Sequence, residues 1–180
     1  MMALGNEAKA SDLLIFLVDE VRFGLPALEV VELTMACAVT PLPQGAQIEL
    51  DNLPALRPAL EGIVNYHGEL AGVISLSSRF GQKSRPLRAS EHFIFARSGK
   101  DLVALRADRV LEIASAPVED LELIDNLSNL KSNQKNVTGA AKLSDGLVLI
   151  FDLQTFLTTS ESEALAHILS LARSQPEGAT

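Results

Sequence analysis

The chain has a single cysteine, no tryptophan and one tyrosine, and aromatic residues make up only 4% of its 180 positions. One cysteine, Cys37, excludes an internal disulfide, and a chain of this length can bury enough apolar surface to fold without one. Basic residues are also scarce, because 15 Lys and Arg stand against 23 Asp and Glu, for a formal net charge of −8. A surface of this sign is poorly suited to neutralising phosphates, so nucleic acid is not expected as a partner.

Long hydrophobic runs are missing as well. The longest, such as 13–18 and 147–151, fall far short of the roughly 20 residues that a membrane-spanning helix needs, so no direct membrane insertion is expected. The N-terminus lacks the basic region and the cleavage site of a signal peptide. Together with the single cysteine, this predicts a cytoplasmic protein.

The usual local signs of catalysis are absent too. The sequence contains no Gly-x-Ser-x-Gly elbow, no phosphate-binding glycine loop and no Gly-x-Gly. The three histidines, His67, His92 and His167, have no second ligand at metal-binding spacing, and Cys37 lies in an apolar stretch typical of a buried thiol. We therefore expect no catalytic residue, no metal site and no cofactor.

What the sequence does contain is a series of short apolar runs separated by turn residues, the pattern of a mainly β barrel or sandwich. Extended segments are predicted at 13–18, from 25 through 31 and 34–39, and at 70–77, 92–96, 102–107, 110–113, 137–143 and 147–153. Ser98 to Asp101 predicts a tight hairpin, and Asp145-Gly146 predicts a hairpin with a type I′ turn.

Two segments are predicted to be helical. A short helix is expected near 53–60, limited to one or two turns by Pro58, and a C-terminal helix near 161–173. Ser160 and Glu163 predict a capping box for the second helix, whose apolar stripe should dock on the sheets. The polar stretch 115–136 is expected to be a long surface connection, with a marginal helical pattern at 118–127. We predict a disordered N-terminus at 1–11, one domain at 12–173 and a frayed C-terminus at 174–180.

One local concentration of positive charge stands out in this acidic chain. Arg79, Lys83, Arg85 and Arg88 fall within ten residues. A solvated loop and a surface for an acidic partner explain this cluster about equally well.

Four stretches occur in order along the predicted domain: Phe23-Gly24-Leu25-Pro26 with Val30-Val31-Glu32, then Leu60 to Glu69, then Leu105 to Ile113, then Thr138 to Leu143 with Asp145 to Leu153. Together they resemble the CheW family of bacterial chemotaxis coupling proteins, over about residues 12 to 157. The resemblance implies a fold of two small five-stranded SH3-like β-barrels around a shared core. It also implies a non-catalytic adaptor, or scaffold, of two-component signal transduction, which couples the cytoplasmic tip of a chemoreceptor to the regulatory domain of a CheA-type histidine kinase.

The resemblance also implies a receptor-binding groove, whose positions match Val30, Glu32, Gly62, Asn65 and His67. For Gly62 and Gly68, a structural role as turn glycines with positive φ explains the residue at least as well. Asn65 likewise suits a turn cap. Two departures from the family pattern are visible: His67 stands where the family usually has Arg, and Ala71-Gly72-Val73-Ile74-Ser75-Leu76 stands where it usually has Val-Pro, two hydrophobic residues and Asp-Leu. Histidine is a weaker and pH-sensitive partner for Glu32 than arginine would be.

Other functions stay open on the sequence alone. Within the family, the alternatives are a regulator that binds one partner only, or an adaptor of a non-flagellar chemosensory-like pathway such as surface motility. From a different class, a small-molecule-binding or hydrolytic β-barrel is less favoured, because the sequence offers no convergent set of reactive polar groups.

Overall fold

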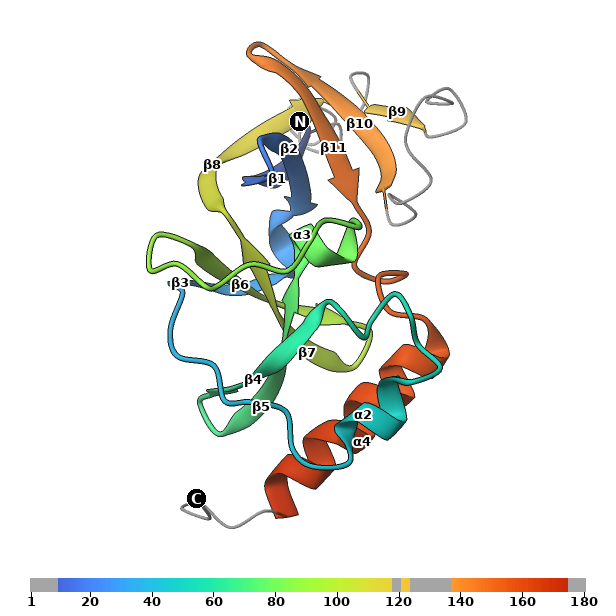
Figure 1. The fold of residues 1–180 in the computed structure, drawn as a ribbon. Helices are drawn as coiled ribbons and strands as arrows, with labels where there is room; N and C mark the ends of the chain where they lie inside the picture. Colours follow the sequence, from blue (N-terminus) through green and yellow to red (C-terminus); the bar gives the residue numbers. More distant parts are fainter. Residues whose placement is uncertain (1–9, 118–120, 124–136, 175–180) are drawn as a thin grey trace.

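The computed structural model describes residues 10–117, 121–123 and 137–174, which form two β-sheets with four short or terminal helical elements around them (Figure 1). The first sheet has six strands in the order β8-β1-β2-β11-β10-β9. Its strands are β1 (Ala10–Val18), β2 (Val21–Pro26), β8 (Arg109–Pro117), β9 (Leu121–Leu123), β10 (Val137–Leu143) and β11 (Gly146–Phe151). All neighbours are antiparallel except β2 and β11, which run parallel.

The second sheet has five strands in the order β3-β6-β7-β5-β4. Its strands are β3 (Val30–Met35), β4 (Leu60–Tyr66), β5 (Glu69–Ser75), β6 (His92–Ser98) and β7 (Asp101–Ala107), with β5 and β7 parallel. An isolated antiparallel bridge between Thr40 and Ile63 joins the chain beyond β3 to β4, the opposite edge of the sheet. The predicted mainly β architecture of two small sheets is confirmed, and β9 gives the first sheet a sixth strand.

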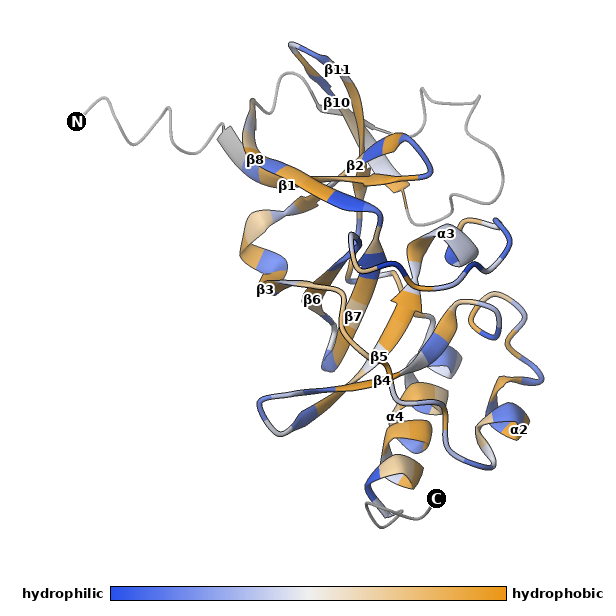
Figure 2. Cartoon of the chain, turned by 60° about the vertical axis from the view of Figure 1, so that its left-hand side comes forward, coloured by the Kyte–Doolittle hydropathy of each residue, from blue (hydrophilic) through white to orange (hydrophobic). Residues whose placement is uncertain are grey.

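The two sheets share one apolar core, as the shared-core prediction requires. Phe16 and Phe23 from the first sheet and Ile94 and Leu105 from the second are each at most 1% exposed and belong to the same cluster. Figure 2 shows the hydrophobic stretches of β1, β5 and β7, with polar residues gathered in the turns. Since these side chains pack together, the two sheets form one rigid unit.

The helical elements are η1 (Ala27–Glu29), α2 (Ala46–Leu50), α3 (Leu76–Arg79) and α4 (Thr159–Ser174). The prediction of a helix near 53–60 is wrong: the helix lies at 46–50, and 54–59 forms turns. The Leu56 and Arg57 amides donate to the Leu53 carbonyl, but Pro58 has no amide hydrogen to continue the ladder.

The predicted C-terminal helix is confirmed, but its cap lies two residues earlier than expected. The Thr158 hydroxyl accepts from the Glu161 amide at 3.2 Å, and the Glu161 carboxylate accepts from the Thr158 amide at 3.0 Å. Thr158 and Glu161 therefore form the capping box, in place of Ser160 and Glu163. The apolar stripe of α4 is buried as predicted, through Ala164, Leu165, Ile168 and Leu169.

The hairpins at 98–101 and at 143–146 are confirmed. The type I′ turn is wrong for the second, because its central residues, Ser144 and Asp145, do not have positive φ, and Gly146 alone does at 133°. Residues 121–123 form β9 in the stretch expected to be a connection with a marginal helical pattern, and the rest of 118–136 lies outside the described residues.

The chain ends differ slightly from the predicted domain limits. β1 begins at Ala10 and α4 ends at Ser174, so each includes residues assigned to a disordered or frayed end. Residues 1–9 and 175–180 lie outside the described residues. Cys37, expected to be buried, is exposed, because it lies beyond the end of β3. Among the described residues, no helix is both long and apolar enough to cross a membrane.

Candidate functional site

The seam between the two edge strands of the second sheet, β3 and β4, brings three of the five predicted groove residues together. Glu32 lies on β3, Asn65 lies on β4, and His67 begins the turn between β4 and β5. The His67 Nε2 atom is 3.6 Å from the Glu32 Oε2 atom, so the two side chains are within ion-pairing distance. The His67 side chain is 78% exposed and that of Glu32 is 42% exposed, which places the imidazole outermost.

The turn that carries His67 is held by local contacts. His67 and Gly68 both have positive φ, at 50° and 91°, in a two-residue loop between Tyr66 and Glu69. The Asn65 Oδ1 atom accepts from the Gly68 amide at 2.7 Å. The Asn65 side chain therefore caps the turn, and in this structure its carboxamide acts on the backbone of its own hairpin.

Tyr66 supports the imidazole from the side. Its ring meets the His67 ring edge to face, with centroids 4.5 Å apart, and lies 4.8 Å from the ring of Phe95 on β6. The Glu32 carboxylate, as hydrogen-bond acceptor, raises the pKa of the Tyr66 phenol. Glu32, Tyr66 and His67 are therefore one constellation. Tyr66, the only tyrosine in the sequence, was not predicted as a groove residue, although it lies beside His67.

The other two predicted groove residues, Val30 on β3 and Gly62 on β4, contact other parts of the protein. Val30 packs against the shared core. Gly62 lies on β4 beside the Thr40 bridge, and a Cβ atom there would be 2.3 Å from the Thr40 carbonyl oxygen and 2.4 Å from a Val39 methyl. The observed contacts of Gly62 are thus with its own chain, at the point where the second sheet closes.

Replacement of Gly62 by Ala is therefore expected to lower the free energy of unfolding by about 1–3 kcal/mol, because the added methyl overlaps backbone atoms that cannot rotate away. Urea denaturation would measure the loss. Gly68→Ala is a useful comparison: its added methyl meets no atom within 4 Å, and its strain comes from the backbone at φ +91° alone. Unchanged stability of Gly62→Ala would contradict the close packing at the seam.

A second surface feature lies on β3. β3 alternates between half-buried and exposed residues, and its exposed members, Val31, Leu33 and Met35, are 44%, 39% and 55% exposed. Leu28, in η1 just before the strand, is fully exposed. We call these four residues the β3 apolar strip. Since exposed apolar side chains gathered on one edge strand are common at protein interfaces, the strip is a candidate contact surface.

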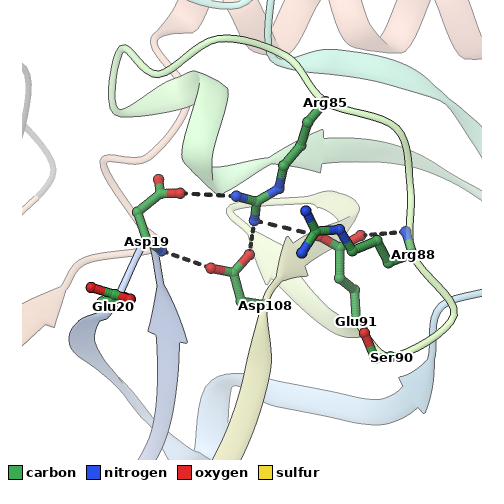
Figure 3. Close-up of a pocket in the computed structure, with 7 residues that line it drawn as sticks. All are labelled: Asp19, Glu20, Arg85, Arg88, Ser90, Glu91 and Asp108. Atoms are coloured by element: carbon green, nitrogen blue, oxygen red, sulfur yellow. Dashed lines mark hydrogen bonds and ion pairs between the residues drawn. The ribbon is translucent and has the colours of Figure 1, made fainter.

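Two of the four clustered basic residues, Arg79 and Arg85, are paired with carboxylates of the protein itself. Arg85 donates to Asp19 at 3.1 Å and to Asp108, and it lies 3.4 Å from Glu91 (Figure 3). The cavity beside it has a volume of about 430 Å³ and is lined by Asp19, Glu20, Arg85, Arg88, Ser90, Glu91 and Asp108. Neither a solvated loop nor a partner surface describes Arg85, because it ties the loop before β6 to the β1–β2 turn and to the start of β8.

A second arginine lies deeper in the same network. Arg106, on β7, is paired with Glu91 at 3.0 Å, and their side chains are 4% and 3% exposed. Arg106 also donates to Glu61 at 2.6 Å and to the carbonyls of Arg85 and Pro86 at 3.1 and 2.9 Å. Burial raises the pKa of Glu61, and the charge of Arg106 opposes this rise. We call Arg106, Glu91, Glu61, Arg85, Asp19 and Asp108 the ionic network.

A third arginine, Arg79 of α3, joins α3 to the first turn of α4. Arg79 makes two 2.7 Å hydrogen bonds to the Glu161 carboxylate and one of 2.6 Å to the Phe156 carbonyl. Its guanidinium carbon also lies 5.1 Å from the centroid of the Phe156 ring. Arg79 is therefore a structural residue, while Lys83 and Arg88 remain exposed.

The chemistry available to this arrangement is recognition by charge and apolar contact. In the described part of the chain, no three His, Cys, Asp or Glu side chains are grouped as metal ligands. The charged side chains of the ionic network are hydrogen-bonded to one another, and the histidine at the β3–β4 seam faces a carboxylate and a tyrosine ring. The groups open to a partner include His67, Glu32 and the β3 apolar strip.

Comparison with known proteins gives a consistent result. A family model described as "CheW-like domain" matches residues 12–161. The chemotaxis protein CheW of Helicobacter pylori (strain ATCC 700392 / 26695) is 23% identical over 143 residues, which cover 79% of this chain and 78% of that protein. The crystal structure of the scaffolding protein TtCheW from Thermoanaerobacter tengcongensis has a similar fold, with a TM-score of 0.67 and 22% identity over 81% of this chain and 91% of that one.

Proposed function

Because the chain belongs to the CheW-like domain family, which its family match over residues 12–161 shows, we propose that it is a non-catalytic cytoplasmic adaptor that couples chemoreceptors to a CheA-type histidine kinase. The proposal is supported by this match together with two separate candidate contact surfaces on one domain. The β3–β4 seam offers Glu32 and His67, and the β3 apolar strip offers Leu28, Val31, Leu33 and Met35.

The position of these surfaces suits simultaneous binding. On β3, Glu32 pairs with Phe95 and Leu33 pairs with Ile94 of β6, so the two side chains point to opposite faces of the sheet. A partner on one face therefore leaves the other face free. We assign the seam to the receptor tip, in agreement with the resemblance of Glu32, Asn65 and His67 to the family groove, and the β3 apolar strip to the kinase regulatory domain.

The proposal can be tested by calorimetric titration with two sets of partners from the same genome. The first set is the regulatory domain of each CheA-type kinase, and the second is the cytoplasmic tip of each chemoreceptor. The expected result is binding of both, including a ternary complex. Failure to bind any of these kinase domains would overturn coupling. Kinase binding without receptor binding would instead favour a regulator with one partner, and the gene neighbourhood would distinguish a flagellar pathway from one that controls surface motility.

The β3 apolar strip gives a sharper prediction. Leu33→Asp is expected to weaken kinase-domain binding at least tenfold, because a charge in the desolvated centre of an interface is costly, and to leave receptor-tip binding within about twofold. Ile48→Asp on α2 is the matched control, since Ile48 is an apolar residue with 74% exposure on a different element. Equal kinase binding by wild type, Leu33→Asp and Ile48→Asp would remove the strip from the interface.

A further inference from the structure

The most exposed group at the β3–β4 seam is a histidine, His67, which faces the Glu32 carboxylate. Histidine is the side chain whose charge ordinarily changes between about pH 5 and 8. The His67 imidazole is 78% exposed, and the Glu32 carboxylate, 3.6 Å away, is 42% exposed. A partner that approaches the seam therefore meets the imidazole first.

The backbone of His67 is held by local contacts of the hairpin, and its ring lies beside Tyr66. The backbone is held at φ +50° by the two-residue turn, which Asn65 caps, and the ring lies against the edge of Tyr66. A preorganised contact loses little conformational entropy when it binds, so a single charged group can contribute measurably to affinity.

The other titratable groups near the His67 ring are Glu32, Tyr66 and Glu69. Glu32 faces it from β3, and Tyr66 precedes it on β4. Glu69, which ends the turn, is engaged by Arg97 of β6 through two hydrogen bonds of 2.9 and 2.8 Å. Hydrogen bonds from Arg97 lower the pKa of Glu69, so this carboxylate is ionised and paired. The charge that a partner meets at the seam thus depends on the proton of His67 and on Glu32.

We propose that His67 is a proton-gated anchor for a carboxylate of the partner that docks on the β3–β4 seam. The protonated imidazole lies between Glu32 on its own chain and an acidic side chain of the partner, and it attracts both. When the imidazole is neutral, the two carboxylates face each other without a cation between them. Docking is then coupled to the uptake of one proton, and affinity falls as pH rises. This inference rests on the proposed adaptor function, because it specifies the chemistry of the same receptor-binding surface.

The test measures the association constant for the receptor tip between pH 6 and pH 8. Wild type is expected to bind about tenfold more weakly at pH 8 than at pH 6, since linkage to one proton changes the constant by at most tenfold per pH unit. Calorimetry in two buffers of different ionisation enthalpy gives the proton uptake directly, and it should be positive near neutral pH.

Variants of His67 distinguish proton-dependent binding from a purely structural role of this residue. His67→Arg keeps the positive charge at all pH values, so it should abolish the pH dependence and bind about tenfold more tightly than wild type at pH 8. His67→Asn removes the charge but tolerates the left-handed backbone, so it should bind weakly at every pH. His167→Gln is the matched control, because His167 is also exposed and also pairs with a glutamate, Glu49, but lies on α4. It should behave as wild type.

The outcomes distinguish the inference from the proposed function. Receptor-tip binding by wild type with no pH dependence, or an equal gain for His67→Arg at pH 6 and pH 8, would overturn the proton gate and leave the adaptor role intact. A pH dependence that His67→Asn retains and His167→Gln loses would also overturn it. Absence of binding to any receptor tip at pH 6 or pH 8, by wild type and by His67→Arg, would overturn both the receptor assignment of the seam and the gate that rests on it.

Discussion

Replacement of Arg106 by Met is expected to lower the free energy of unfolding by about 3–5 kcal/mol, the usual cost of removing one partner from a buried ion pair. Glu91 is 3% exposed and receives two hydrogen bonds from Arg106, at 3.0 and 3.2 Å. Without Arg106 it keeps only the Arg88 amide at 2.8 Å and the more distant Arg85 guanidinium at 3.4 Å. The carbonyls of Arg85 and Pro86 lose a donor as well.

The chain offers a matched control for this prediction. Arg97 pairs with Glu69 through two hydrogen bonds, but their side chains are 45% and 41% exposed. Arg97→Met is therefore expected to cost at most about 1 kcal/mol, because water screens and replaces the exposed pair. Urea denaturation of wild type and both variants would compare them. Similar losses of unfolding free energy for Arg106→Met and Arg97→Met would show that burial of the ionic network contributes nothing to stability.

Replacement of Arg79 by Met is the second large effect, with an expected loss of about 3–5 kcal/mol in the free energy of unfolding, because it leaves the Glu161 carboxylate buried in the first turn of α4 without its cation. The side chains of Arg79 and Glu161 are 6% and 4% exposed. The double variant Arg79→Met with Glu161→Met should recover much of the loss, since two apolar groups can replace a buried ion pair at little cost. Denaturant titration of the three proteins measures this recovery.

The same pair makes stability depend on pH. Burial alone would raise the pKa of Glu161, but hydrogen bonds from Arg79 and from Thr158 hold it below the ordinary value of 4.5. Because the folded state binds its proton less readily than the unfolded state does, the stabilisation by Glu161 is present above pH 4.5 and is lost as pH falls through the lowered folded pKa. The stability difference between wild type and Arg79→Met should therefore shrink on acidification. A constant difference from pH 7 to pH 3 would contradict this account.

Local turn chemistry accounts for the parts of the fold that the sequence predicted well. The hairpin at Ser98–Asp101 is specified by residues next to one another, and Gly99 takes the positive φ of 61° that its turn requires. The β1–β2 hairpin was not predicted, because Asp19 and Glu20 adopt φ values of 50° and 68° that non-glycine residues rarely adopt. The Asp19 backbone is held by a 2.7 Å hydrogen bond to Asp108, 89 residues away, which a local pattern cannot show.

A local sequence pattern also cannot show which distant residues the charged side chains pair with. Arg79 and Arg85 look like parts of an exposed basic loop, but their carboxylate partners, Glu161 and Asp19, are 82 and 66 residues away in the sequence. At the candidate site, the resemblance to the family placed Glu32 and His67 in one groove, and the structure brings them to 3.6 Å. The contribution of Tyr66 depends on the edge-to-face contact of its ring, which follows from the hairpin geometry rather than from the residue pattern.

The strand order of the first sheet has a consequence for biosynthesis. β1 and β2 come from the beginning of the chain, but β2 finds its second neighbour only in β11, which ends at Phe151. The second sheet, from β3 to β7, is complete by Ala107, so it can form while the ribosome is still translating the rest. β2 must wait for β11, so we expect the first sheet to be completed after the second, with the exposed β2 edge until then as the surface that a chaperone would protect.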